Sequence, residues 1–413
     1  MLPFIRSNGR WLLGGFLLTF FSGFGQTIFI GASGGELREA FGLTNGEWGN
    51  IYGLATLASA ASLPFVGRVM DFRPGWQVAA VTIPLLALAC LSMALASSVL
   101  MLGVSLFLLR LLGQGMMSHI ALTETGRWFA ASRGKAISLV VLGFQAQEAI
   151  FPLSFTLIVA AFGYAMGWYV AAAVLLLVAL PAIVLLLRQP REPQGDAPAT
   201  SGTARDWTRN EVLGDPIFYI LLCGVLAPAF IGTTLFFHRD YLAELRGLSE
   251  QTMGLGIPVM AALTVAFALL TGRLVDRFGA AGVLPTFLLP LAAGCLSVAF
   301  LQGPWGVIVF FGFFGISYGF ATTLFGSLWP EAYGTRHLGS IRSVTQSAMV
   351  FATALGPWIT GGLIDRGIAL PLQFAWMALY CVVACAALFW ATRRLLARRA
   401  HSPSSSGGEA EPA

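Results

Sequence analysis

Charged residues are scarce in this chain of 413 residues, since Asp, Glu, Lys and Arg together make up only 10% of it. A soluble domain carries about 25% charged residues. Hydrophobic residues reach 57% instead, which excludes a water-soluble globular protein and a disordered chain. The composition predicts an all-α polytopic membrane protein, because a chain of this length accommodates about twelve helices of ~20 residues with their connections.

Sequence motifs for soluble catalysis are also missing. The chain has no Gly-x-x-x-x-Gly-Lys-Ser/Thr segment to hold a nucleotide phosphate, and no His-Glu-x-x-His or Cys-x-x-Cys pattern to bind zinc. Its five cysteines lie inside apolar runs, where cysteine behaves as a small hydrophobe. Its 24 basic residues stand singly or in pairs between apolar runs. We therefore expect no enzyme activity, no cofactor, no metal and no nucleic-acid partner.

The basic residues are distributed unevenly among the loops that join twelve predicted spans. With the N-terminus inside, 19 of the 24 fall in inner segments, four fall in outer segments, and Arg110 lies within a span. Short cytoplasmic loops carry an excess of Lys and Arg. The distribution predicts an integral plasma membrane protein, in a bacterial inner membrane, with both termini in the cytoplasm.

One long polar stretch divides the chain into two halves. The sequence predicts an N-terminal six-helix half over 1–187, a flexible cytoplasmic linker over 188–215 and a C-terminal six-helix half over 216–392. The last residues, 393–413, are polar and predict a disordered cytoplasmic tail.

The two halves align without a gap at an offset of 205 residues. The matching pairs are Gly67 and Gly272, Arg68 and Arg273, Asp71 and Asp276, Gly134 and Gly339, and Pro152 and Pro357. Parallel repeats related by an axis along the membrane normal are one construction of secondary transporters, which bind substrate between the repeats near the midplane. The repeat therefore predicts two pseudo-symmetric halves.

Three segments resemble motifs of the major facilitator superfamily. Residues 67–73 and their copy 272–279 resemble its signature loop, which joins spans 2 and 3 and spans 8 and 9 in the cytoplasm. The segment RLLGQG at 110–115 resembles its span-4 arginine motif. Residues 356–362 are similar to its antiporter glycine–proline motif, which belongs to span 5 in the family but stands in span 11 here. The resemblance covers essentially the whole chain and implies a monomeric secondary transporter in the lipid bilayer that works by alternating access.

The resemblance also implies a cytoplasmic gate around the two signature loops. The gate residues it implies are Gly67, Arg68, Asp71, Arg127, Gly272, Arg273, Asp276, Glu331 and Arg336. A carboxylate stabilises a helix N-terminus, so we expect Asp71 to meet the inner end of span 11. We expect Glu331 and Arg336 to form a matching cluster with Arg273 and Asp276. The alternative is a set of solvated turn charges that only fix topology.

Two charged residues are predicted near the membrane midplane. Arg110 lies about 16 Å into span 4, and Glu148 lies at mid-depth in span 5. Such residues are costly in hydrocarbon and usually face a cavity or pair with each other. In one interpretation Arg110 binds an anionic substrate and Glu148 clamps it or carries a proton, and in the other the two form a structural pair.

Polar residues in several spans complete the predicted site. The predicted substrate-binding residues are Arg110, Gln114, Gln26, Tyr52, Gln145, Tyr318 and Gln346, and the predicted proton-coupling residues are Glu148 and His119. Gln26 shares a helical face with Thr19 and Thr27.

These observations favour a proton-coupled carrier of small organic anions, such as monocarboxylates. A proton-coupled exporter of amphipathic drugs or cations, in which Glu148 meets the positive charge, is the alternative. A membrane sensor with a transporter fold would need a signalling domain, which the linker and tail do not offer.

Overall fold

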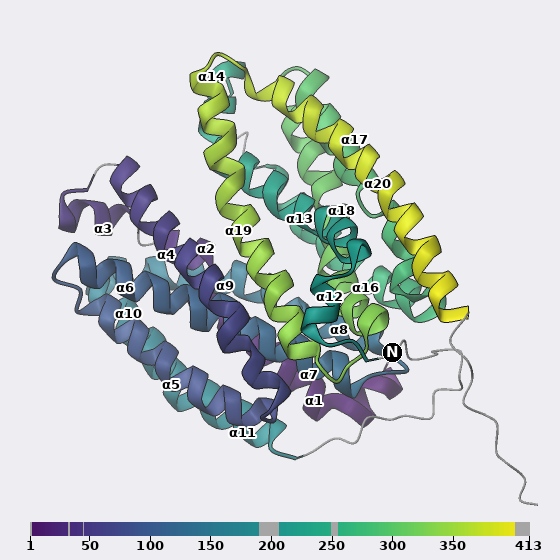
Figure 1. Cartoon of the computed structure of the whole chain (residues 1–413). Coiled ribbons are helices and arrows are strands. Elements are labelled where there is room, and N and C mark those ends of the chain that lie inside the picture. Colours follow the sequence, from purple (N-terminus) through teal and green to yellow (C-terminus); the bar gives the residue numbers. More distant parts are fainter. Residues whose placement is uncertain (1, 32–33, 44, 190–205, 249–254, 401–413) are drawn as a thin grey trace, which may run out of the picture.

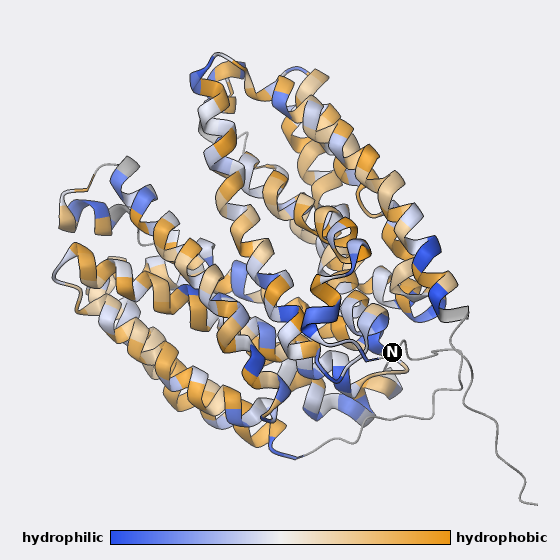
Figure 2. Cartoon of the chain, in the orientation of Figure 1, coloured by the Kyte–Doolittle hydropathy of each residue, from blue (hydrophilic) through white to orange (hydrophobic). Residues whose placement is uncertain are grey.

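The computed structural model describes residues 2–31, 34–43, 45–189, 206–248 and 255–400, and all regular secondary structure in these ranges is helical (Figure 1). Within these ranges, eleven helices are long and apolar enough to cross a membrane. Figure 2 shows that apolar residues dominate these helices along most of their length. The predicted all-α membrane fold is confirmed. A bilayer favours helices because every backbone N–H and C=O must be paired within the segment.

Helices from residues 2–187 build the first lobe. They are α1 (Leu2–Phe21), η1 (Ser22–Gly25), α2 (Thr27–Gly31), α3 (Gly34–Phe41), α4 (Asn45–Val66), η2 (Gly67–Asp71), α5 (Gly75–Ala94), α6 (Val99–Leu109), η3 (Arg110–Met117), α7 (Ser118–Trp128), α8 (Arg133–Val140), α9 (Leu142–Phe162), α10 (Tyr164–Val174), η4 (Leu175–Ala179) and α11 (Leu180–Leu187).

The remaining helices build the second lobe. They are α12 (Arg209–Leu213), α13 (Pro216–Phe237), α14 (Arg239–Arg246), α16 (Gly256–Val283), η5 (Leu284–Thr286), α17 (Leu289–Phe300), α18 (Trp305–Tyr333), α19 (Leu338–Asp365) and α20 (Leu370–Ala400).

Predicted spans 8 and 9 form one nearly continuous helical stretch, Gly256–Phe300, of 45 residues. At ~1.5 Å per residue this is about 68 Å, more than twice the ~30 Å hydrocarbon core. Gly279 interrupts it with φ 76° and ψ 160°. Glycine adopts this conformation without a Cβ clash, so the chain changes direction there. This stretch is long enough for both predicted spans, so the eleven candidate stretches of the described residues accommodate the twelve predicted spans.

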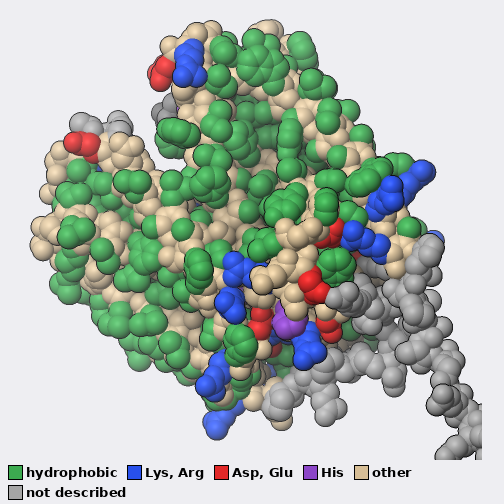
Figure 3. Space-filling model, viewed as in Figure 1, with side chains coloured by type: hydrophobic (Ala, Val, Ile, Leu, Met, Phe, Trp, Pro, Cys, Tyr) green, Lys and Arg blue, Asp and Glu red, His purple; other side chains and the backbone are tan. Residues whose placement is uncertain are grey.

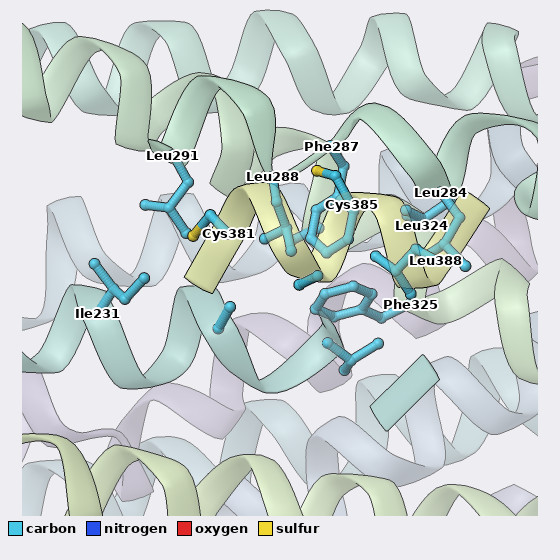
Figure 4. Close-up of a cluster of buried hydrophobic side chains, with 14 of the residues drawn as sticks. Ile231, Leu284, Phe287, Leu288, Leu291, Leu324, Phe325, Cys381, Cys385 and Leu388 are labelled. Carbon is cyan, nitrogen blue, oxygen red and sulfur yellow. The ribbon is translucent and has the colours of Figure 1, made fainter. Parts of the chain in front are cut away.

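Each lobe has its own apolar core. Buried side chains from residues 12–187, together with Ala268, form one cluster, and side chains from residues 212–395 form the other. Figure 4 shows part of the second cluster, in which Cys381 lies beside Leu291 and Cys385 lies near Leu288. Both thiols thus occupy positions that a small hydrophobe would fill.

The lobes meet at one end of the molecule, formed by η2, the start of α8, α12 and the start of α19, which we call the basic end. Lys and Arg side chains gather there (Figure 3). At the opposite end, which carries α3 and α14, a notch separates the two lobes in the same view. The molecule is therefore closed at the basic end and open at the other.

Two predicted boundaries differ from the structure. α20 continues to Ala400, so the prediction of a disordered tail from Arg393 is wrong for residues 393–400. The predicted flexible linker contains α12, whose start is fixed by a capping box between Thr208 and Glu211. Residues 190–205 and 401–413 of the predicted linker and tail lie outside the described residues.

Candidate functional site

Asp71 joins the two lobes at the basic end. Its carboxylate accepts hydrogen bonds from the backbone N–H groups of Gly339 and Ser340, both at 2.8 Å. These are free donors in the first turn of α19, where a negative charge is also stabilised by the helix dipole. Arg127 donates to the same carboxylate at 2.7 Å. The contact that the sequence predicted between Asp71 and span 11 is present, and Arg127 is its cation.

Asp276 makes the corresponding contact in the opposite direction. Its carboxylate accepts from the backbone N–H groups of Gly134 at 2.9 Å and Lys135 at 3.3 Å, in the first turn of α8. The Lys135 ammonium lies 3.5 Å from the same carboxylate. Asp276 is the repeat equivalent of Asp71, and Gly134 is the repeat equivalent of Gly339, at the same offset of 205 residues. Each half therefore supplies one aspartate and one helix start, and each aspartate binds the helix start of the other half.

Glycines allow the backbones to approach at these contacts. A Cβ on Gly134 would lie 2.4 Å from the carbonyl oxygen of Gly272, and one on Gly272 would lie 2.6 Å from the Ser138 hydroxyl. A Cβ on Gly67 would lie 2.6 Å from that of Ser343. These positions have no room for a side chain, so three of the repeated glycines are explained by close packing between the lobes.

The predicted second charge cluster is assembled differently. Asp276 pairs with Lys135 rather than with Arg273 or Arg336, whose side chains are exposed. Glu331 instead accepts from the backbone N–H groups of Ala280 at 2.5 Å and Ala281 at 3.4 Å, where the helix resumes after Gly279. The prediction that these four charged residues form one cluster is corrected. Arg68 is likewise exposed, and Asp71 forms its ion pair with Arg127.

Arg110 lies where span 1 is broken. The α1 helix ends at Phe21, and Gln26 is extended before α2 begins at Thr27. A Cβ on Gly113 would lie 2.6 Å from the Cα of Gly25, so spans 1 and 4 cross in backbone contact at this break. Residues 110–117 form a π-helix, a feature often found at functional sites.

The Arg110 guanidinium is 2% exposed and bonds only to neutral groups. Its Nη1 donates to the Gly25 carbonyl at 3.3 Å and to the Thr27 hydroxyl at 3.1 Å. Its carbon lies 5.4 Å from the centre of the Tyr52 ring, and the Tyr52 hydroxyl donates to Thr27 at 2.8 Å. The Nε atom of Arg110 has no partner among the described groups. Arg110, Thr27 and Tyr52 form a cluster that we call the arginine site.

Arg110 and Glu148 do not pair in this conformation. Among the described residues the ion pairs within 4 Å include neither of them. Glu148 lies half-buried in α9. The prediction of a direct Arg110–Glu148 pair is therefore corrected, because the arginine faces the break in span 1 instead.

The glutamines predicted to bind substrate differ in their hydrogen bonding. Gln114 and Gln145 each have a buried amide atom without a partner among the described groups. Gln26 donates to the Ser22 hydroxyl at 3.5 Å. Gln346 is half-buried in α19. Thr19 is buried and donates to the Val140 carbonyl at 2.6 Å. The break in span 1 lies between Thr19 and Gln26, so the two residues do not share the predicted helical face.

His119 lies near the contacts at the basic end rather than in the arginine site. Its Nε2 donates to the Gly67 carbonyl at 3.1 Å, and its Nδ1 is buried without a partner among the described groups. Arg342, which the sequence counts with the loop charges, is buried in α19 and donates to the carbonyls of Phe325 and Gly326. Pro330, four residues after Gly326 in α18, has no N–H to donate to the Gly326 carbonyl, which is therefore open to Arg342. The proline was the feature of the sequence that could have indicated a partner for Arg342.

A family model of the major facilitator superfamily matches residues 15–357 and 239–413. The chain belongs to the major facilitator superfamily. No curated protein matches it in sequence.

Solved structures of superfamily members share the fold. The chain is 15% identical to the transporter FucP in its outward conformation, with a TM-score of 0.71 over 93% of this chain and 98% of that one. It is 15% identical to the proton:xylose symporter XylE, with a TM-score of 0.68 over 94% and 95%. It is 14% identical to the human organic anion transporter MFSD10, with a TM-score of 0.67 over 94% and 99%. The family and these folds make the protein a secondary transporter in a membrane, not an enzyme.

Proposed function

We propose that the protein is a proton-coupled carrier of small organic anions such as monocarboxylates, and that Arg110 binds the anion. The observation that carries this proposal is a buried guanidinium with no carboxylate partner among the described residues. Buried charges are paired or stabilised by hydrogen bonds, because isolated ones are costly. An anionic substrate would supply the missing charge, and the planar guanidinium matches a carboxylate.

The hydrogen bonds of Thr27 support an anion at the arginine site. A threonine hydroxyl has one donor hydrogen and two acceptor lone pairs. Arg110 and Tyr52 both donate to this hydroxyl, so its own hydrogen points elsewhere. Thr27 is exposed and donates to no group among the described residues. Arg110 and Thr27 together would present N–H and O–H donors to the two oxygens of one carboxylate.

Glu148 is the proposed proton carrier. Acidic residues at mid-depth in membrane proteins are rare and recur in proton relays. Glu148 lies in α9, which contacts α16 of the other lobe, so the rocking of the lobes would change the surroundings of this carboxyl group. XylE, which has a similar fold, is a proton:xylose symporter, and this supports the proton as coupling ion.

The basic end is the proposed cytoplasmic side. The distribution of 19 basic residues in inner loops against four in outer loops supports this orientation. The structure is then outward-facing, with the Asp71 and Asp276 contacts as the closed cytoplasmic gate. FucP in its outward conformation has a similar fold.

Uptake into reconstituted vesicles tests the proposal. With a pH gradient, the protein should accumulate a radiolabelled monocarboxylate such as lactate or benzoate. Arg110→Lys should lower carboxylate binding by roughly 10–100-fold, because a charged hydrogen bond contributes about 1.5–3 kcal/mol and an ammonium lacks the planar fork. Glu148→Gln should retain exchange but lose accumulation driven by the gradient. Arg366→Lys, exposed and distant from the arginine site, is the control.

A structural role for Arg110 predicts a different result. It would make Arg110→Lys poorly folded, and a double variant Arg110→Met, Glu148→Leu would regain stability and transport. An active double variant would therefore refute the proposed roles of both residues. Thermal stability of every variant separates loss of folding from loss of binding.

Export of amphipathic cations is the second candidate. A cavity of about 410 Å³ between α13, α19 and α20 is walled by Phe230, Phe351, Trp376 and Tyr380. Aromatic walls with few polar groups suit an amphipathic cation. Stabilisation of the purified protein by amphipathic cations and not by carboxylates would favour this function.

A further inference from the structure

A second cleft of about 510 Å³ lies at the basic end, away from the arginine site. The start of α13 and the last turns of α20 form its walls, and its lining includes Asp215, Trp390, Arg394 and Arg398. The transport mechanism proposed above uses none of these residues. Figure 3 shows Lys and Arg side chains along this end of α20.

One of the two arginines in the cleft is neutralised. Arg398 donates two hydrogen bonds to the Asp215 carboxylate, at 2.7 and 2.9 Å. The Ile217 N–H and the Tyr333 hydroxyl donate to the same carboxylate at 3.2 and 3.1 Å. Burial disfavours the charged form of Asp215, but Arg398 and these two donors outweigh it and lower the pKa of the carboxyl group. Asp215 and Arg398 therefore contribute no net charge.

Arg394 supplies the unneutralised charge. Its guanidinium carbon lies 5.2 Å from the centre of the Trp390 ring, and the side chain is exposed. No carboxylate among the described residues pairs with it. The cleft thus offers a guanidinium beside an indole ring, with a bound ion pair behind it.

The membrane-facing surface next to the cleft is apolar. Val382, Val383 and Phe389, in the turns of α20 before Trp390, are each about half exposed or more. Tryptophan favours the membrane–water interface, with its apolar body toward the acyl chains. A ligand that fills the cleft from the bilayer therefore needs an anionic head and an apolar tail.

We propose that this cleft binds the phosphate head group of an anionic phospholipid, with Arg394 as the phosphate ligand and the acyl chains along α20. Basic pockets and juxtamembrane arginines recognise anionic head groups. Arg398 would keep its pair with Asp215 and so hold the end of α20 against α13. The proposal concerns a site separate from the substrate path and does not depend on the identity of the transported solute.

Arg393 is a matched control, because it is the neighbouring residue on the same helix. It is also exposed, but its guanidinium lies over Phe389, 4.4 Å from the ring centre, and it does not line the cleft. If the lipid were held only by general attraction to basic residues, Arg393→Gln and Arg394→Gln would lower its affinity equally. If the lipid occupies the cleft, only Arg394→Gln lowers its affinity.

Native mass spectrometry of the full-length protein tests this difference. The protein is titrated with phosphatidylglycerol, with phosphatidylcholine and with inorganic phosphate. We expect selective retention of phosphatidylglycerol, an about five-fold loss of that affinity in Arg394→Gln, and no loss in Arg393→Gln. Equal losses in the two variants would reduce the proposal to general surface attraction. Phosphate that displaced the lipid at a similar concentration would show a free-anion site and overturn the lipid assignment.

Discussion

Replacing Asp71 by Asn should loosen the basic end without removing the substrate site. The carboxylate holds two amide N–H groups of α19 in the opposite lobe and the Arg127 guanidinium in its own lobe. An Asn side chain keeps one acceptor oxygen and loses the charge. The variant therefore loses at least one of the two bonds from residue 71 to α19, while Asp276 retains its contacts with α8.

The expected change in the ratio of open to closed basic end follows from the hydrogen bonds of Asp71. Asp71 is well buried, with its side chain 6% exposed, so solvent screens its interactions only partly. A hydrogen bond to a charged group contributes about 1.5–3 kcal/mol. A loss of about 2 kcal/mol would raise the ratio of open to closed basic end roughly 30-fold, because 1.4 kcal/mol is a factor of ten.

A cysteine at Ser343 reports the opening. Ser343 is fully buried in α19 beside Gly67, behind the Asp71 contact. In a background without the native cysteines, its rate of reaction with N-ethylmaleimide follows the open population when opening and closing are fast. Asp71→Asn should raise this rate roughly 30-fold. The control Glu244→Gln, exposed at the other end, should leave it unchanged.

A labelling rate within two-fold of the parent, with normal yield and thermal stability, would mean that the Asp71 contact does not hold the lobes together. Substrate affinity measured in the same variant should stay near the parent value, since Asp71 belongs to the basic end. A large loss of affinity would contradict the separation of gate and substrate site.

Three further predictions concern other contacts. Arg209→Gln should also raise labelling of the basic end, because Arg209 in α12 donates at 3.2 Å to a carbonyl near the end of α4 in the other lobe. Gly113→Ala should lower thermal stability by about 1–3 kcal/mol, since its Cβ would lie 2.6 Å from Gly25, whereas Gly103→Ala, 3.8 Å from its nearest neighbour, should be tolerated. A cysteine at Glu244 should react with an impermeant reagent from outside cells; protection there would reverse the proposed orientation.

The sequence determined the spans and the contact between Asp71 and span 11. Apolar runs of about 20 residues are stable in a bilayer only with their backbone bonds satisfied internally, so their position in the chain largely fixes the helices. The offset marked Asp276 as the equivalent of Asp71, but only the structure showed that its partners are Gly134 and Lys135 at the start of α8.

The tertiary structure alone decided which way the midplane charges face. Sequence position gives the depth of Arg110 and Glu148, but their direction depends on the rotation and breaks of each helix. At the break over 22–26, Arg110 lies toward Gly25 and Thr27, and among the described residues it forms no ion pair with Glu148. Helix rotation is set by packing between residues far apart in the chain, such as Gly25 and Gly113, which no local pattern encodes.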